Sequence, residues 1–196
     1  MIFEEKSGKY YYHYPFPVAI IGVQSENKTN FMSAAWHTQI SFDPPLYGIL
    51  ISPKRYTNQL IQNTKAFSVN FLRFEDFKIA GYVGRTSGKE IDKIKIFNLE
   101  YSLGKIVPVP ILKNAIACYE CKVVDERTYG DHILYVGEIV GIHYDERFYK
   151  DNLSNSLLLY HGNDRYTVAQ MEDSMRFGKE EVQEEIKNIL SKEEKK

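Results

Sequence analysis

The sequence from residue 17 to residue 52 decides the fold, because it alternates short apolar runs with turn residues. It consists of PVAIIGVQ (17–24), the polar turn SENKT (25–29), NFMSAAWHTQIS (30–41), the breaker DPP (43–45) and LYGILIS (46–52). The apolar runs have the β-branched and aromatic content of strands, and the interruptions are short turns. Parallel strands need crossover connections of about a dozen residues or more, so this segment predicts three antiparallel strands.

Further strands follow this segment. We predict a fourth strand over 66–72, with the sequence AFSVNFL, and two more over 117–127 and 133–144. Between the last two, the residues Tyr129-Gly130-Asp131-His132 supply the turn chemistry of a β-hairpin. Strand after strand joined by short turns indicates a mainly β, antiparallel barrel with short helices rather than a series of βαβ units.

Two segments have the signals of helix starts. Ser52-Pro53 places a cap residue before a proline at the first turn, and residues 56–61 carry one apolar face. Ser87-Gly88-Lys89-Glu90 has the form of a capping box, with Glu90 three positions after Ser87. We expect the second helix to run to about Phe97.

No repeat or flexible linker divides the chain before about residue 170, so we expect one domain over 1–170. The remainder, 171–196, is highly charged, and its apolar residues Val182, Ile186, Ile189 and Leu190 recur at helical spacing. We expect this tail to contain an amphipathic helix that docks on the body or on a partner subunit.

Composition and charge limit the classes of function. The 196 residues (22.8 kDa) are 43% apolar, which is ample for a buried core, and 25 Lys+Arg against 26 Asp+Glu leave a net charge of −1. Nucleic-acid binding usually needs a basic face, and a spanning helix needs about 20 apolar residues in a row. The first residues also lack the order of a signal peptide. We therefore expect a cytoplasmic protein without nucleic-acid or membrane partners.

Several common catalytic motifs are absent from the sequence. It has no G-x-G-x-x-G and no G-x-S-x-G, and residues 84–89 (GRTSGK) miss the P-loop spacing by one residue. The five histidines, at positions 13, 37, 132, 143 and 161, form no pair at the spacing of a local metal motif. The sequence therefore names no metal ligand and no catalytic acid, base or nucleophile.

The only two cysteines form a C-x-x-C pair, Cys118 and Cys121. Such a pair at a helix start can act as a redox couple. Here the flanking residues predict a strand, on which positions three apart point to opposite faces. We expect two buried thiols instead.

Both predicted helix starts carry hydroxyl groups and cations. Ser52-Pro53-Lys54-Arg55 and Ser87-Gly88-Lys89 combine free backbone N–H groups with positive charge, as anion sites do. Ordinary caps have the same residues, so the pattern alone leaves both interpretations open. Residues 32–38 (MSAAWHT) place small side chains next to the only tryptophan. They would let a flat ligand approach backbone donors, or simply let two layers pack closely.

The sequence resembles the flavin reductase-like family, the flavoredoxin group of FMN-binding split barrels, over about residues 10–166. The matching motifs, in order, are N-x-MSAAWHT-x-ISFDPP (30–45), SP-x-RYT (52–57), F-x-VN (67–70), SGK-x-x-DK (87–93), C-x-VVDE (121–126), GDH with VGE (130–132 and 136–138), and YHG (160–162).

This resemblance implies a six-stranded antiparallel split barrel, a homodimer and an FMN near the subunit interface. By position, the backbone of Met32, Ser33, Ala34, Ala35 and Trp36 would follow the isoalloxazine ring. Ser52, Arg55 and Thr57, together with Ser87, Gly88 and Lys89, would surround the phosphate. His161 lies in a stretch that approaches the flavin in some members of the family.

The implied reaction is hydride transfer from NADH or NADPH to the flavin, followed by electron delivery to an acceptor, with the cofactor carrying the chemistry. Free flavin, ferric iron, a monooxygenase and a redox protein are all candidate acceptors. The alternative is an FMN-binding electron carrier or flavin store without efficient NAD(P)H turnover. A barrel with an empty cleft is a third possibility, and the sequence does not separate the three.

Overall fold

The computed structural model describes residues 2–3, 5, 12–26, 28–149, 156–169, 178–184 and 187. The strands are β1 (Phe16–Pro17), β2 (Ala19–Ser25), β3 (Lys28–Ala34), β4 (His37–Phe42), β5 (Pro45–Ile51), β6 (Ala66–Leu72), β7 (Tyr101–Leu103), β8 (Pro110–Leu112), β9 (Ala115–Tyr129), β10 (His132–Tyr144), β11 (Leu158–Gly162) and β12 (Arg165–Val168). The α-helices are α1 (Tyr56–Thr64), α2 (Phe77–Arg85) and α3 (Lys93–Ile96), and single 3₁₀ turns are η1 (Phe74–Asp76) and η2 (Glu146–Phe148).

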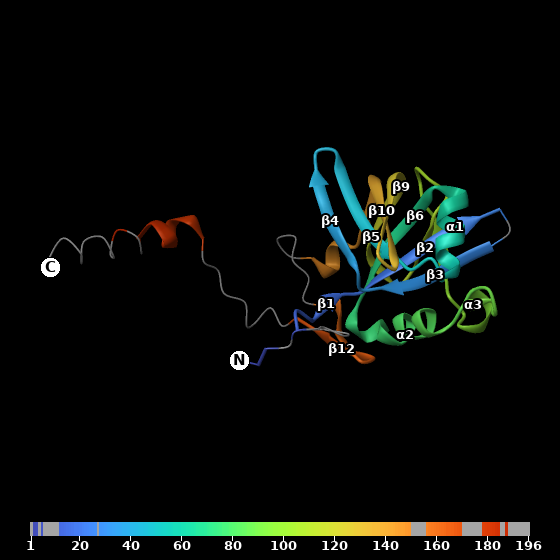
Figure 1. The fold of residues 1–196 in the computed structure, drawn as a ribbon, viewed down its shortest axis with the longest axis horizontal. Helices are drawn as coiled ribbons and strands as arrows, with labels where there is room; N and C mark the ends of the chain where they lie inside the picture. Colours follow the sequence, from blue (N-terminus) through green and yellow to red (C-terminus); the bar gives the residue numbers. More distant parts are fainter. Residues whose placement is uncertain are drawn as a thin grey trace.

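The main sheet has seven strands in the order β3-β2-β6-β9-β10-β5-β4, and every neighbouring pair is antiparallel. The sheet curls until its two edge strands, β3 and β4, converge at one point (Figure 1). Two small sheets, β1-β11-β12 and β7-β8, lie outside it. The predicted mainly β, antiparallel barrel with short helices is confirmed, with a seventh strand in the sheet.

The extra strand arises because the predicted strand over 30–41 is two strands. The chain leaves β3 at Ala34 and enters β4 at His37, and these strands are the opposite edges of the sheet. Residues 35 and 36 alone connect the two edges, and the Trp36 carbonyl accepts a hydrogen bond from Leu50 N–H (2.9 Å) on β5. The sequence pattern did not reveal the break at residues 35 and 36, because the residues before and after it both have the composition of a strand.

Two apolar cores stabilise the fold. The first fills the barrel with alternate residues of β2, β5, β6 and β9 and with Leu60 and Ile61 of α1. The second lies between the outer face of the sheet and α2, where Ile20 and Phe31 pack against Ala80 and Val83. Figure 1 shows α2 running beneath β3, which makes this helix the wall opposite the edge of the barrel.

Both predicted helix starts are displaced. Residues 52–55 form a turn in which Arg55 N–H donates to the Ser52 carbonyl (2.9 Å), and α1 begins only at Tyr56. The capping box at Ser87 is wrong, because Glu90 N–H donates to the Ser87 carbonyl (3.0 Å) within one tight turn. Asp92 caps the short helix α3 instead, accepting from Lys95 N–H (3.1 Å). The two helices α2 and α3 lie on either side of the turn.

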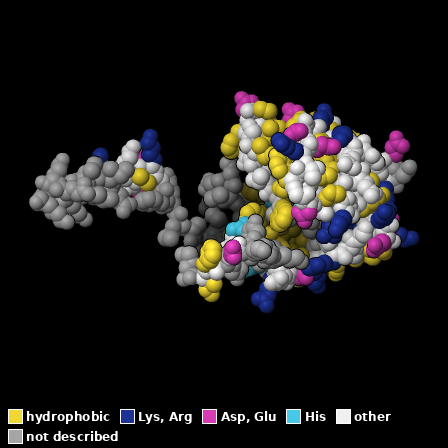
Figure 2. Space-filling view, in the orientation of Figure 1, with side chains coloured by type: hydrophobic (Ala, Val, Ile, Leu, Met, Phe, Trp, Pro, Cys, Tyr) yellow, Lys and Arg dark blue, Asp and Glu magenta, His cyan; other side chains and the backbone are white. Residues whose placement is uncertain are grey.

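The described part of the tail includes helical residues 179–184, and Ile186, Ile189 and Leu190 lie outside the described residues. The docking of this helix and the domain boundary at residue 170 therefore stay predictions. Among the described residues, no helix is long and apolar enough to cross a membrane. Lys and Arg side chains are intermixed with Asp and Glu over the face shown in Figure 2.

A buried carboxylate fixes the loop between β7 and β8. Glu120, on β9, is fully buried and accepts hydrogen bonds from the N–H groups of Lys105, Ile106 and Val107 (2.8 Å each). His143 Nε2 lies 2.6 Å from the same carboxylate. Burial by itself raises the pKa of Glu120, but the hydrogen bonds from His143 and from the three N–H groups outweigh it and lower the pKa to about 2.

We expect Glu120→Gln to lower the free energy of unfolding by about 3 kcal/mol at pH 7, because an amide cannot accept all four hydrogen bonds. A pKa lowered in the folded state gives stability that is complete above the ordinary pKa of 4.5 and is lost as pH falls toward 2. The difference between the two proteins should therefore shrink between pH 4.5 and 2 in urea unfolding. Glu100→Gln, which removes an exposed partner of Lys113, is the control and should change little. A pH-independent difference would contradict this account.

Candidate functional site

A cleft opens where the two edges of the sheet meet. It consists of two adjoining compartments, which share the lining residues Ser33, Ala34, Ala35, Arg55, Gly84 and Tyr160. The first compartment, of about 570 Å³, extends toward the turn before α1 and the β9–β10 hairpin. The second, of about 650 Å³, extends between α2 and the β11–β12 hairpin. Each is within the size range of small-ligand sites.

The floor of the cleft is the end of β3 and the two-residue connection to β4. Ser33 Oγ donates to the Ala80 carbonyl of α2 (2.6 Å), which ties the helix to the floor. Gly84, one turn later on α2, faces Ser33, and a Cβ there would lie only 3.2 Å from the Ser33 Cβ. A small residue at each position therefore keeps helix and strand close while the floor stays flat.

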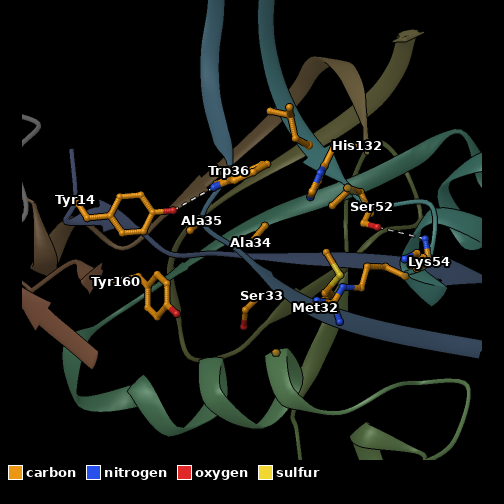
Figure 3. A pocket seen from close by; sticks show the side chains of 14 residues that line it. Tyr14, Met32, Ser33, Ala34, Ala35, Trp36, Ser52, Lys54, His132 and Tyr160 are labelled. Atoms are coloured by element: carbon orange, nitrogen blue, oxygen red, sulfur yellow. Dashed lines mark hydrogen bonds between the residues drawn. The ribbon is translucent and has the colours of Figure 1, made fainter. Parts of the chain in front are cut away.

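Aromatic side chains form the rim of the first compartment (Figure 3). Trp36 is 48% exposed, and its Nε1–H donates to the Tyr14 hydroxyl (3.1 Å). The Trp36 ring lies 4.6 Å from the His132 ring, centroid to centroid, and His132 is held by Asp131 (2.7 Å). The tryptophan is thus fixed from both sides although half of it faces solvent.

Positive charge gathers at the other end of the first compartment. Lys54 and Arg55 line it from the turn before α1. Behind them Lys93 is buried and donates to the carbonyls of Phe31 (2.8 Å) and Val83 (2.7 Å). Burial, and then the charge of Arg55, lower the pKa of Lys93 to about 8. Among the described residues, neither Arg55 nor Lys93 forms an ion pair with a carboxylate, so this end of the cleft can accept an anion.

The structure brings most of the sequence-predicted site residues together, but not all of them. Met32, Ser33, Ala34, Ala35, Trp36, Ser52 and Arg55 line the first compartment. Thr57 is buried beneath it, where its hydroxyl accepts from Asn30 Nδ2 (2.9 Å). Asn30 Oδ1 is buried and has no hydrogen-bond partner among the described residues. Gly88 lies so close to this oxygen that no Cβ would fit.

Ser87, Gly88 and Lys89 do not line either compartment, and Gly88 lies against Asn30 and Tyr56. His161 is exposed and lines neither compartment, whereas its neighbour Tyr160 lines both. Arg55 precedes its helix as the N-cap residue and Lys89 belongs to no helix. The prediction that Lys89 lies at the start of a helix is therefore wrong.

The sequence analysis named Lys54 only as part of the possible anion site at residues 52–55. It did not predict six other residues that line the first compartment: Tyr14, Leu50, Ile51, Gly84, His132 and Tyr160. Lys54 and His132 stand inside motifs that the sequence displays, next to Arg55 and in the hairpin turn, so a signal was present. Tyr160 and Gly84 also stand in quoted segments, YHG and GRTSGK, but nothing in those segments points to the cleft. Tyr14 stands in none, and only long-range packing brings it to the cleft.

The remaining candidate groups are structural. His37 is buried between the Tyr47 hydroxyl (2.6 Å) and the Pro17 carbonyl (2.9 Å), and burial lowers its pKa. Cys118 and Cys121 are free and buried, and burial raises the pKa of both thiols, as expected for packing groups rather than a redox couple. Among the described residues no three His, Cys, Asp or Glu side chains gather as a metal site.

A flat floor, an aromatic rim and uncompensated cations at one end define a binding site for a planar, anionic ligand at the edge of a β-barrel. The chain belongs to the family of flavin reductase like domains, which matches residues 11–169. Its fold is the split barrel of that family.

Three similar proteins represent this family. The crystal structure of an FMN-binding protein from Thermus thermophilus is 34% identical and covers 90% of this chain and 100% of its own, with a TM-score of 0.84. Flavoredoxin from Methanosarcina acetivorans is 25% identical over 90% of this chain and 95% of its own, with a TM-score of 0.77. An NADH-dependent flavin reductase from Rhodococcus sp is 26% identical over 63% of this chain and 65% of its own.

Proposed function

We propose that this protein binds FMN in the first compartment and is an NAD(P)H-dependent flavin reductase. The observation that carries the proposal is the pair of cations, Lys54 and Arg55, that line one end of the cleft beside its floor and form no ion pair with a carboxylate among the described residues. An isoalloxazine ring needs the flat floor, and a phosphate needs the charge. The FMN-binding relative from Thermus thermophilus and the Rhodococcus reductase support the same assignment.

The side chains present fit this cofactor. Ser33, Ala34 and Ala35 are small enough for a ring system to lie against the floor, and Trp36 would cover its edge. Ser52 and Lys54 are linked by a long hydrogen bond, 3.5 Å from Lys54 N to Ser52 Oγ (Figure 3). Arg55 follows them in the same turn and also lines the compartment. This turn would present a hydroxyl and two cations to the phosphate. We keep Thr57, Ser87, Gly88 and Lys89 as proposed members of this phosphate site, acting from behind it.

The chain's own part in the reaction is binding and orientation. A bound flavin would supply the chemistry, accepting a hydride from reduced nicotinamide and passing electrons to an acceptor. The floor would fix the plane of the ring and exclude water from one side of it. Lys54 and Arg55 would hold the phosphate end.

A second candidate function is an FMN-binding electron carrier, which the likeness to a flavoredoxin favours. Anaerobic mixing of the FMN-loaded protein with NADH and, separately, NADPH distinguishes the two. We expect rapid loss of the visible band of the oxidised flavin with at least one nucleotide, as a reductase requires. If dithionite reduces the bound flavin but neither NADH nor NADPH does, the protein is an electron carrier. A protein that binds no FMN would end both proposals.

The phosphate end has its own test. A charge-assisted hydrogen bond contributes about 1.5–3 kcal/mol, so Arg55→Ala should weaken FMN binding roughly ten- to a hundred-fold. Riboflavin affinity should hardly change, because riboflavin lacks the phosphate. Lys89→Ala should weaken FMN in the same selective way if the turn at 87–89 contributes charge.

Flavin fluorescence quenching measures both affinities, and Arg127→Ala is the control, because Arg127 stacks on Tyr129 in the hairpin and does not line the cleft. Equal weakening of FMN and riboflavin by Arg55→Ala would mean that the ring site or the fold is damaged. If Arg55→Ala weakened neither FMN nor riboflavin binding, the phosphate of FMN would have to bind elsewhere in the protein.

We also propose a homodimer, which accepts electrons from NADH or NADPH and passes them to free flavin, ferric iron, a redox protein or a monooxygenase. Support comes from β4, an edge strand whose Phe42 is 85% exposed and whose Ile40 is also exposed. Exposed apolar edges are usually covered by another chain.

Light scattering should therefore give the mass of two 22.8 kDa chains at micromolar concentration. Phe42→Glu should shift the mass toward one chain, because it places a charge in the covered edge. Leu103→Glu, at an apolar and half-exposed site on β7 outside the main sheet, should leave the dimer intact. A wild-type protein with the mass of one chain would overturn the proposal.

A further inference from the structure

The second compartment adjoins the proposed flavin site. It is about as large as the first, and its walls are α2, through Ala80, Gly81 and Arg85, and the β11–β12 hairpin, through Asn163, Asp164 and Tyr166. The two compartments share the floor from Ser33 to Ala35. A ligand in the second compartment would therefore touch a ligand in the first, as two molecules that exchange electrons directly must.

An ion pair joins the two walls of the second compartment. Arg85, at the end of α2, donates through Nε (2.9 Å) and through Nη2 to the same oxygen of Asp164. The two residues are 79 positions apart in the sequence. Asn163 and Asp164 both have positive φ values, of 49° and 60°, which define the tight type I′ turn of a hairpin and fix where the carboxylate points.

This ion pair can open at little cost. The side chain of Arg85 is 68% exposed and that of Asp164 is 57% exposed, and exposed pairs contribute little to stability because water and salt screen them. A guanidinium is also the preferred partner of a phosphate, which it can bind with two parallel hydrogen bonds. An incoming phosphate group could therefore replace Asp164 as the partner of Arg85.

Aromatic rings provide the other half of a nucleotide site. Tyr160 and Tyr166 both line the second compartment, with ring centroids 5.6 Å apart. Phe77 extends the group, 5.9 Å from Tyr166, at the start of α2. Flat heterocycles stack on such faces. Stacking surfaces beside an exchangeable guanidinium suit a ligand with planar bases and phosphates.

We propose that the second compartment binds the nicotinamide dinucleotide donor and that Arg85 leaves Asp164 to bind one of its phosphate groups. The proposal rests on the proposed function, since it gives the donor a place next to the flavin. Asp164 then competes with the donor for Arg85. Removing its charge should strengthen donor binding, whereas a merely structural ion pair would respond to the loss of either partner in the same way.

Titration calorimetry with NADP⁺, which binds without transferring a hydride, tests the proposal on FMN-loaded protein and on FMN-free protein. We expect Arg85→Gln to weaken NADP⁺ binding about tenfold, the loss of one charge-assisted hydrogen bond, and Asp164→Asn to strengthen it severalfold. Lys65→Gln and Glu126→Gln break a comparable long-range exposed pair, elsewhere on the barrel, and should leave NADP⁺ binding unchanged.

The outcomes separate this proposal from the one on which it rests. Unchanged NADP⁺ affinity in both variants, or equal weakening by Arg85→Gln and Asp164→Asn, would overturn it. So would an Arg85→Gln protein that loses affinity for FMN, keeps riboflavin affinity and binds NADP⁺ normally, because Arg85 would then serve the flavin phosphate. Failure of the wild-type protein to bind FMN would instead refute the proposed function, and NADP⁺ binding to the FMN-free protein would still be measured.

Discussion

The short link between β3 and β4 is the constraint on which the rest of the structure depends. Because these strands are the two edges of one sheet, a link of only residues 35 and 36 forces the sheet to curl until its edges meet. The same link then forms the floor of the cleft. Side chains larger than those of Ala34 and Ala35 would fill the space between the edges, so the small residues are a consequence of the topology as much as of the ligand.

Helix α2 depends on this floor and in turn closes it. Ser33 Oγ bonds to the helix backbone, Gly84 lets the helix approach, and Lys93 joins the Phe31 carbonyl of β3 to the Val83 carbonyl near the end of α2. A buried ammonium is costly, and Arg55 nearby increases the cost. The fold thus keeps a buried charge, held by two backbone carbonyls, behind the part of the cleft that Arg55 lines.

Much of the fold was predictable from local pattern. The strand at residues 66–72 has the predicted bounds, and the hairpin around Gly130 and the two long strands beside it are within two residues of prediction. The errors have a common cause. The helix signals at Ser52 and Ser87 involve the correct residue types, but turns closed by backbone hydrogen bonds compete for the same groups and displace the helices. The strands β11 and β12 were missed because they are short and half-exposed.

The sequence by itself determined the antiparallel character of the barrel, the small residues of the floor and the Ser-Pro-Lys-Arg turn, because these depend on neighbours within a few residues. The tertiary structure alone decided which side chains meet across the cleft. Tyr14 bonds to Trp36 over 22 positions and Arg85 to Asp164 over 79, and neither contact has a local signal. It also separated Thr57 and the turn at Ser87 from the cleft surface. Such distances depend on how the sheet curls, which the packing of the whole chain sets.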